Sequence, residues 1–247
     1  MIEEAGQLEG FLPLSYRTPK ERDYVQFLWE AFETNLEHGK YQFAFLAYHM
    51  LVMSFVYFNI WQIKQIKPRE FATALIGFSK GLEKELLEAT SPFTFAAVGE
   101  SQVMRFLKLI QCDNGKIGAY TKLVKDRNET AHPNGNIFFS SEAELVIKVR
   151  EIIRAVTEIQ GHSESIILEG YRRFLLDSAD PEIREHAEVA DQVREVLIHG
   201  SYMSLIDLDF CAQFDVAALA DNPNFAEIEA LHAEVRKWVD GDDAIAA

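Results

Sequence analysis

Apolar residues recur every three or four positions along most of the chain, which is the spacing of one face of an α-helix. Residues 19–38 show this pattern and stop before Gly39, and residues 41–66 continue it with few polar interruptions. Alternation of apolar and polar residues, the mark of a half-buried strand, is confined to the short run NIFF. The pattern therefore predicts an all-α protein.

Prolines, glycines and polar turns divide the following part of the chain into further predicted helices. A proline at the first helical position opens each of the segments 68–87 and 92–111. After the turn CDNG, a helix is expected over residues 116–131. It should end there because the residue before Pro133 is biased away from helical geometry.

The last third of the chain shows the same helical spacing. Residues 141–160 predict a helix that Gly161 closes, and residues 163–176 predict another. The sequence DSADPE marks a boundary, after which residues 181–198 predict a helix opened by its proline. Shorter helices are expected up to Trp238.

The segment 41–63 is long enough to span a bilayer, since its 23 residues carry no formal charge. Its polar residues would be costly facing lipid; they are Gln42, His49, Ser54, Asn59 and Gln62. A helix buried on nearly all sides within a helical protein gives the same pattern. We favour the buried helix, with no membrane partner, and expect its histidine and asparagine to be satisfied polar groups of the core.

Charge is distributed unevenly along the chain. The net charge of −15 argues against a protein that coats nucleic acid without specificity. Residues 102–127 nevertheless hold six basic and two acidic side chains, whereas residues 142–247 hold nine basic and 23 acidic ones. The basic stretch leads directly into the sequence RNETAH, although a solvated helix face would give the same local composition.

Two cysteines, Cys112 and Cys211, allow no disulfide framework and no cysteine-rich zinc site. The histidines show neither the HExxH motif nor clustered ligand spacing, and no glycine-rich phosphate loop is present. We therefore expect no metal and no cofactor. The acidic beginning MIEEAGQLEG has no signal-peptide character, so we expect a cytoplasmic protein.

The chemistry of RNETAH suits cleavage of RNA, whose 2′-hydroxyl is a built-in nucleophile. Arg127 offers a permanent charge and a planar set of N–H donors to a phosphate, and the imidazole of His132 is a group that can accept and donate protons. Asn128 can fix the imidazole tautomer or bind a phosphate oxygen. Lys122 and Lys125 are candidate contacts to the RNA backbone.

Spacing alone does not identify a site, because about one such arginine–histidine pair is expected by chance in a chain of this composition. Arg194 and His199 in REVLIHG form a second pair with the same spacing. That pair lies in the acidic region, and Glu195 follows its arginine. We interpret it as structural.

The sequence RNETAHPNG, placed between two predicted helices, resembles the signature of the HEPN superfamily, in which an arginine and a polar residue precede a histidine. Arg127, Asn128 and His132 match that pattern. The resemblance covers roughly residues 20–162 and implies an HEPN-like antiparallel helical bundle within residues 1–162. Residues 163–247, an acidic C-terminal helical segment, are not explained by it.

The resemblance implies a metal-independent endoribonuclease that acts as a homodimer, with two copies of the motif meeting in one cleft. Proteins of this superfamily occur in toxin–antitoxin and phage-defence systems, so RNA and a protein regulator or antitoxin are the expected partners. Some members have lost catalysis and serve as dimerisation or binding modules. A helical scaffold with RNETAH as an exposed helix end is the third alternative.

Overall fold

The computed structural model describes residues 2–133 and 135–241, and its regular structure is helical, which confirms the all-α prediction. Within these ranges the β-structure consists of an isolated bridge between Pro13 and Ser204. The chain forms two compact units. The first comprises the described residues up to Glu9 together with Pro19–Ser163, and the second comprises Gly10–Thr18 and the residues from Glu164 onward.

The first unit is built from short and long helices, and its elements are, in chain order, α1 (Glu3–Gly6), α2 (Pro19–Glu37), α3 (Tyr41–Ile66), α4 (Pro68–Ala74), α5 (Lys80–Leu87), η2 (Pro92–Ala97), α6 (Glu100–Val103), η3 (Met104–Ile110) and α7 (Asn114–Ala131). Two further elements, η1 (Gln7–Phe11) and α8 (Glu142–Asp177), contribute residues to both units. The predicted helices at 19–38 and 41–66 are confirmed to within one residue.

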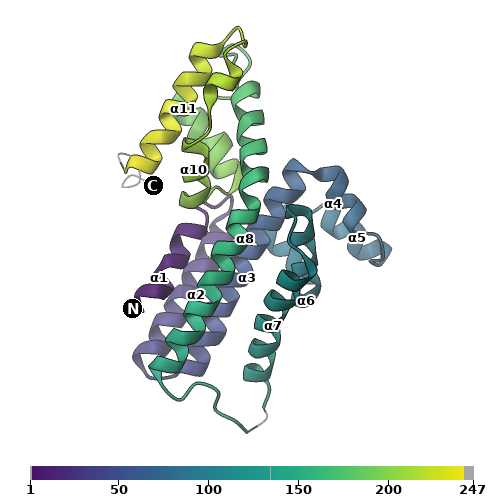
Figure 1. Ribbon diagram of the computed structural model, residues 1–247, viewed down its shortest axis with the longest axis vertical. Coiled ribbons are helices and arrows are strands. Elements are labelled where there is room, and N and C mark those ends of the chain that lie inside the picture. Colours follow the sequence, from purple (N-terminus) through teal and green to yellow (C-terminus); the bar gives the residue numbers. More distant parts are fainter. Residues whose placement is uncertain (1, 134, 242–247) are drawn as a thin grey trace. The chain divides into compact units, whose positions relative to one another are not determined.

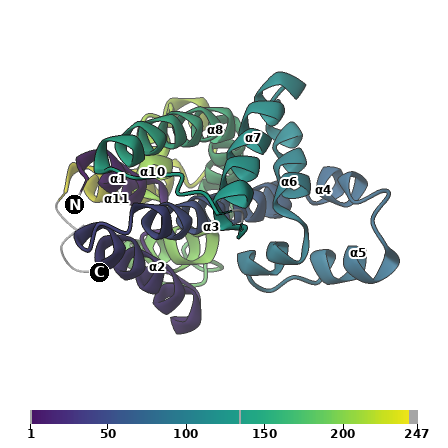
Figure 2. The same cartoon turned by 90° about the horizontal axis from the view of Figure 1, so that it is seen from below.

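Helix α3 forms the centre of the first unit, and the helices α2 and α7 lie beside it (Figures 1 and 2). Its side chains are buried from Ala44 to Ile63 with the exceptions of Leu46 and Met50. The buried side chain of Asn59 has a partner in this core: the hydroxyl of Ser163 on α8 donates to its Oδ1 at 2.5 Å. The burial of these apolar side chains contributes to the stability of the unit.

By length and composition α3 could cross a membrane, as the sequence suggested. In the structure 83% of its most apolar 18-residue window is buried inside the protein. A helix surrounded by protein has its apolar side chains buried against other residues and needs no contact with lipid. The burial of α3 is therefore accounted for by the helices packed around it.

Two predicted helices of the first unit are wrong in detail because residues with non-helical backbone angles interrupt them. The segment 68–87 contains two helices, α4 and α5, separated by a turn in which Gly77 has φ +101°. The segment 92–111 breaks at Val98 and Gly99, because the extended angles of Val98 and the non-helical ψ of 136° at Gly99 separate η2 from α6 and η3. Helical spacing of apolar residues was kept across both breaks, so periodicity alone did not reveal them.

Two predictions in the last third of the chain are also wrong. Gly161 does not close a helix, because α8 runs without a break from Glu142 to Asp177. A glycine inside a helix costs only about 1 kcal/mol, and buried Ile159 and Ile166 continue the apolar face past it. Helical geometry does not start at Pro181 either: it begins with α9 (Val189–Asp191).

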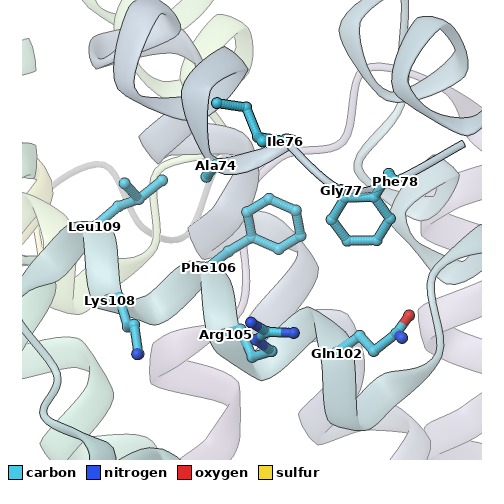
Figure 3. Close-up of a pocket in the computed structure, with 9 residues that line it drawn as sticks. All are labelled: Ala74, Ile76, Gly77, Phe78, Gln102, Arg105, Phe106, Lys108 and Leu109. Carbon is cyan, nitrogen blue, oxygen red and sulfur yellow. The ribbon is translucent and has the colours of Figure 1, made fainter. Parts of the chain in front are cut away.

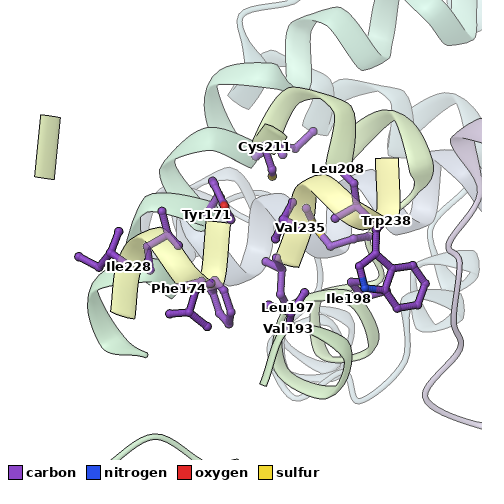
Figure 4. Packing of buried hydrophobic residues seen from close by; sticks show 14 of the residues in the cluster. Tyr171, Phe174, Val193, Leu197, Ile198, Leu208, Cys211, Ile228, Val235 and Trp238 are labelled. Atoms are coloured by element: carbon purple, nitrogen blue, oxygen red, sulfur yellow. The ribbon is translucent and has the colours of Figure 1, made fainter. Parts of the chain in front are cut away.

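The second unit has its own apolar core (Figure 4). Its elements are the end of α8, α9, the π-helical segment η4 (Gln192–His199), α10 (Leu205–Ala212), η5 (Val216–Leu219) and α11 (Phe225–Asp240). Tyr171 of α8 lies within this core, and its hydroxyl is 2.9 Å from Nδ1 of His232 on α11. Ser204 and Asp207 form a capping box that starts α10.

Replacing Leu51 by alanine should lower the free energy of unfolding by about 2–5 kcal/mol, because the substitution leaves a cavity in the core around α3. Leu51 is 0% exposed, whereas its neighbour Met50 is 40% exposed. Denaturant unfolding of the purified protein measures the effect, and Met50→Ala is the matched control, with an expected loss below about 1 kcal/mol. Equal effects of the two substitutions would contradict a core role for α3.

Candidate functional site

Helix α7 carries the RNETAH motif at its C-terminal end. The side chain of Asp113 starts the helix by accepting a hydrogen bond from the backbone N–H of Lys116 at 2.9 Å. The last helical hydrogen bond runs from the N–H of His132 to the carbonyl of Asn128, and His132 itself has the extended angles φ −81° and ψ 142°. The predicted end of the helix before Pro133 is therefore confirmed.

Arg127 is held by a carboxylate that the sequence did not single out. Its Nη2 forms an ion pair with Oε1 of Glu100, the first residue of α6. The side chains of Arg127 and Glu100 are 26% and 21% exposed, so the pair lies at the edge of the protein interior. Nε of Arg127 is buried and has no hydrogen-bond partner within the part of the chain that the structure describes.

A histidine of the core binds the other oxygen of the same carboxylate. Nε2 of His49 on α3 lies 3.0 Å from Oε2 of Glu100, and the His49 side chain is only 2% exposed. An ionised carboxylate only accepts hydrogen bonds, so the Nε2–H of His49 is the donor. Burial alone would raise the pKa of Glu100, but the hydrogen bonds from His49 and Arg127 outweigh it and hold the pKa at about 2.

Two tyrosines lie within electrostatic reach of this network. Burial and then the charge of Glu100 raise the pKa of Tyr57 to about 12, and Arg127 acts in the opposite direction. The pKa of Tyr24 is raised by the same two causes. Both tyrosine rings contact Phe93, with centroid distances of 5.1 Å from Tyr24 and 6.3 Å from Tyr57. Both hydroxyls are therefore kept as neutral hydrogen-bonding groups near the Arg127–Glu100 pair.

The segment that follows α7 is anchored on both sides of His132 by one side chain of α3. Nε2 of Gln42 donates to the carbonyl of Thr130 at 2.9 Å, and its Oε1 accepts from the N–H of Phe138 at 3.2 Å. The His132 side chain between these anchors is exposed. Gln42 thus positions the end of the motif, a role that its place in an apolar run gave no reason to expect.

The remaining predicted site residues lie on α7. Asn128 is half-buried, while Lys122 and Lys125 are exposed. Asp126, between Lys125 and Arg127, forms an ion pair with Lys148 of α8. The structure therefore presents His132 and the two lysines to solvent, whereas it directs the guanidinium of Arg127 to Glu100.

The second arginine–histidine pair is engaged in the structure of its own unit. Arg194 binds Asp191 at 2.7 Å and Glu195 at 2.9 Å, and Nδ1 of His199 lies 2.7 Å from the hydroxyl of Ser15. Both side chains have protein partners, which fits the structural interpretation of this pair. Among residues 2–133 and 135–241, no group of three or more His, Cys, Asp or Glu side chains is placed to hold a metal ion.

Glu100→Gln should lower the free energy of unfolding at pH 7 by about 1–3 kcal/mol, because it removes the charge that binds Arg127 and His49. The pKa of Glu100 is about 2 in the folded protein and 4.5 ordinarily. Its stabilising contribution is therefore present above about pH 4.5 and is lost as the pH falls towards 2. Urea unfolding should show the difference between wild type and variant shrinking from pH 7 to pH 3.

The matched control is Glu88→Gln, which removes an exposed ion pair with Lys84 on α5. This change should alter stability by less than about 0.5 kcal/mol at pH 7. A stability difference for Glu100→Gln that is the same at pH 7 and pH 3 would show that the carboxylate charge does not support the network.

No protein-family model, curated protein or solved structure matches this chain. Because function resides in the chemistry of a site rather than in a fold, the residues around Arg127 and His132 have to carry the functional conclusion.

Proposed function

We propose that the chain is a metal-independent endoribonuclease of HEPN type, in which Arg127 binds the scissile phosphate and His132 is the acid–base group. The observation that carries the proposal is the exposure of the His132 side chain where α7 ends, five residues after an arginine that is still partly exposed. Asn128 orients one of these groups. The exposed side chains of Lys122 and Lys125 contact the RNA backbone.

The reaction follows from the substrate's own nucleophile. The 2′-hydroxyl oxygen forms a bond to phosphorus as a histidine removes its proton, and the bond from phosphorus to the 5′-oxygen breaks as that oxygen takes up a proton. The products are a 2′,3′-cyclic phosphate and a 5′-hydroxyl. Arg127 stabilises the negative charge that builds up on the phosphorane oxygens. Glu100 contacts the guanidinium through Nη2, which fixes its orientation while part of the side chain stays accessible.

A homodimer completes this site. One chain contributes a single RNETAH histidine, whereas proton removal and proton donation are best served by two groups. Two chains of 28.2 kDa that bring their α7 ends together supply a second His132 and a second Arg127. The same proposal includes an HEPN-like bundle for the first unit and a role in a toxin–antitoxin or phage-defence system, with a protein regulator.

A second candidate function is a non-catalytic HEPN-like module that binds RNA or protein. The specific observation in its favour is the ion pair between Arg127 and Glu100, reinforced by His49. In this alternative the carboxylate neutralises the guanidinium and fixes the end of α7 as an interaction surface. The two functions differ in one measurable property, the cleavage of RNA.

The purified protein should cleave total RNA in excess chelator, and His132→Ala should reduce the rate about 10²–10⁴-fold, as expected for loss of an acid–base group. Arg127→Ala should reduce it about 10²–10³-fold, as expected for loss of charge stabilisation. Gel analysis of labelled RNA measures both rates. Arg194→Ala and His199→Ala, which alter the second pair, are the matched controls and should cleave like wild type.

Cleavage that survives both substitutions in the motif would overturn the assignment to RNETAH. No cleavage by the wild-type dimer, together with RNA binding that His132→Ala leaves unchanged, would favour the non-catalytic module. Light scattering gives the oligomeric state of each variant, so a loss of activity through dissociation is distinguished from a loss of chemistry.

Arg127→Lys should retain the positive charge but lose the planar fork that binds two phosphate oxygens. We expect the cleavage rate to fall at least about tenfold, with a smaller loss than Arg127→Ala causes. Single-turnover rates at saturating RNA measure the effect. Full activity of the lysine variant would show that charge alone is sufficient and that the geometry of the guanidinium is not used.

A further inference from the structure

A cavity of about 430 Å³ opens in the first unit between the turn after α4 and the segment formed by α6 and η3 (Figure 3). This volume is within the range of pockets that bind small molecules, roughly 300–1,000 Å³. Its walls combine aromatic rings with basic and amide side chains. It has no role in the RNA cleavage proposed for His132 and Arg127.

The aromatic wall is a stack of three phenylalanine rings. Phe71 and Phe106 stack at 5.3 Å between centroids, and Phe106 and Phe78 at 6.1 Å with only 10° between their planes. Phe71 is fully buried and Phe106, the middle ring of the stack, is 3% exposed, so half-buried Phe78 presents the accessible ring of the stack to the cavity (Figure 3). A flat aromatic ligand would extend an arrangement of rings that the protein already maintains.

The turn that presents Phe78 depends on a glycine. Gly77 has φ +101°, a conformation that side chains with a Cβ rarely adopt, and the N–H of Phe78 donates to the carbonyl of Leu75 at 3.0 Å. The turn breaks the helical pattern between α4 and α5 and directs the chain over the cavity. The position of Phe78 in the aromatic wall is therefore determined by the backbone geometry of this turn.

The polar wall is positively charged. Arg105 and Lys108 of η3 line the cavity, together with Gln102 of α6, and the nine lining residues include no acid. Both basic side chains are exposed, and neither takes part in an ion pair with another described residue. The cavity wall therefore carries two positive charges and no negative one, although the net charge of the chain is −15. They fit an anionic ligand.

We propose that this cavity binds a nucleotide, with the base against the ring of Phe78 and the phosphate against Arg105 and Lys108. Stacking on aromatic rings and charge pairing with phosphate are two interactions that nucleotides offer to proteins. Gln102 supplies an amide for the edge of the base. A free mononucleotide and one nucleotide of an RNA strand present the same chemistry to the cavity. The binding of either ligand does not depend on cleavage of RNA by the chain.

Calorimetric titration of the full chain in chelator tests the proposal with AMP, adenosine and inorganic phosphate as probes. AMP should bind saturably and more tightly than either of its parts, since it engages both walls. Phe78→Ala should weaken AMP binding at least about fivefold through loss of stacking. The double variant Arg105→Ala, Lys108→Ala should weaken it at least about tenfold and reduce its dependence on salt.

The matched controls are Phe27→Ala on α2 and Lys84→Ala on α5, which remove an exposed ring and an exposed charge away from the cavity. Both should bind AMP like wild type, and thermal unfolding followed by circular dichroism confirms that every variant is folded. The proposal would be overturned if neither AMP nor the oligonucleotide described next bound saturably. It would also be overturned if the cavity variants bound these probes as tightly as wild type.

A five-nucleotide oligodeoxyadenylate distinguishes the two sources of the ligand. It lacks the 2′-hydroxyl and therefore cannot be cleaved by the proposed reaction, so its binding is measured independently of nuclease activity. Tighter binding of the oligonucleotide than of AMP, lost in the cavity variants, identifies a nucleic-acid strand as the ligand. Binding of AMP that the oligonucleotide does not displace identifies a free nucleotide.

Discussion

The candidate site depends on one interaction, the binding of the Glu100 carboxylate by His49 and Arg127. It joins three elements of the first unit: the central helix α3, the short helix α6 and the motif helix α7. The partners are mostly shielded from water, so breaking the interaction would leave a largely buried charge without its partner. The position of the RNETAH motif relative to the core is therefore fixed by this network together with the two hydrogen bonds of Gln42.

The same network determines what Arg127 can do. A guanidinium held by a carboxylate is oriented but also partly neutralised, so a phosphate must compete with Glu100 for its charge. Orientation favours catalysis, because a preorganised cation need not rearrange during the reaction. Partial neutralisation of Arg127 by Glu100 favours the non-catalytic binding module instead. His132 is not subject to this conflict, since its side chain is exposed at the end of the helix.

The local parts of the site could be predicted from the sequence, whereas its long-range partners could not. Pro133 determines where α7 ends through sterics between adjacent residues, and the helices around α3 follow from periodicity. His49 and Glu100 are 51 residues apart, and nothing in either local sequence indicates that they meet. His49 was expected to be a polar core group with a hydrogen-bond partner, and the structure confirms this. Its partner is Glu100, which also binds Arg127. Glycines caused errors in the predicted helix boundaries. Gly161 was expected to end a helix but lies inside α8, whereas Gly77 lies in a turn that divides the predicted segment 68–87.

The segment of α6 and η3 links the two proposals, since Glu100 begins it and Gln102, Arg105 and Lys108 line the cavity. The central claim remains the chemistry at the end of α7, and the ends of the RNA fragments produced in excess chelator test it most directly. Mass spectrometry should find 2′,3′-cyclic phosphates and 5′-hydroxyls that are absent from the His132→Ala reaction. Fragments with 5′-phosphates, or cleavage that requires added metal, would contradict this account.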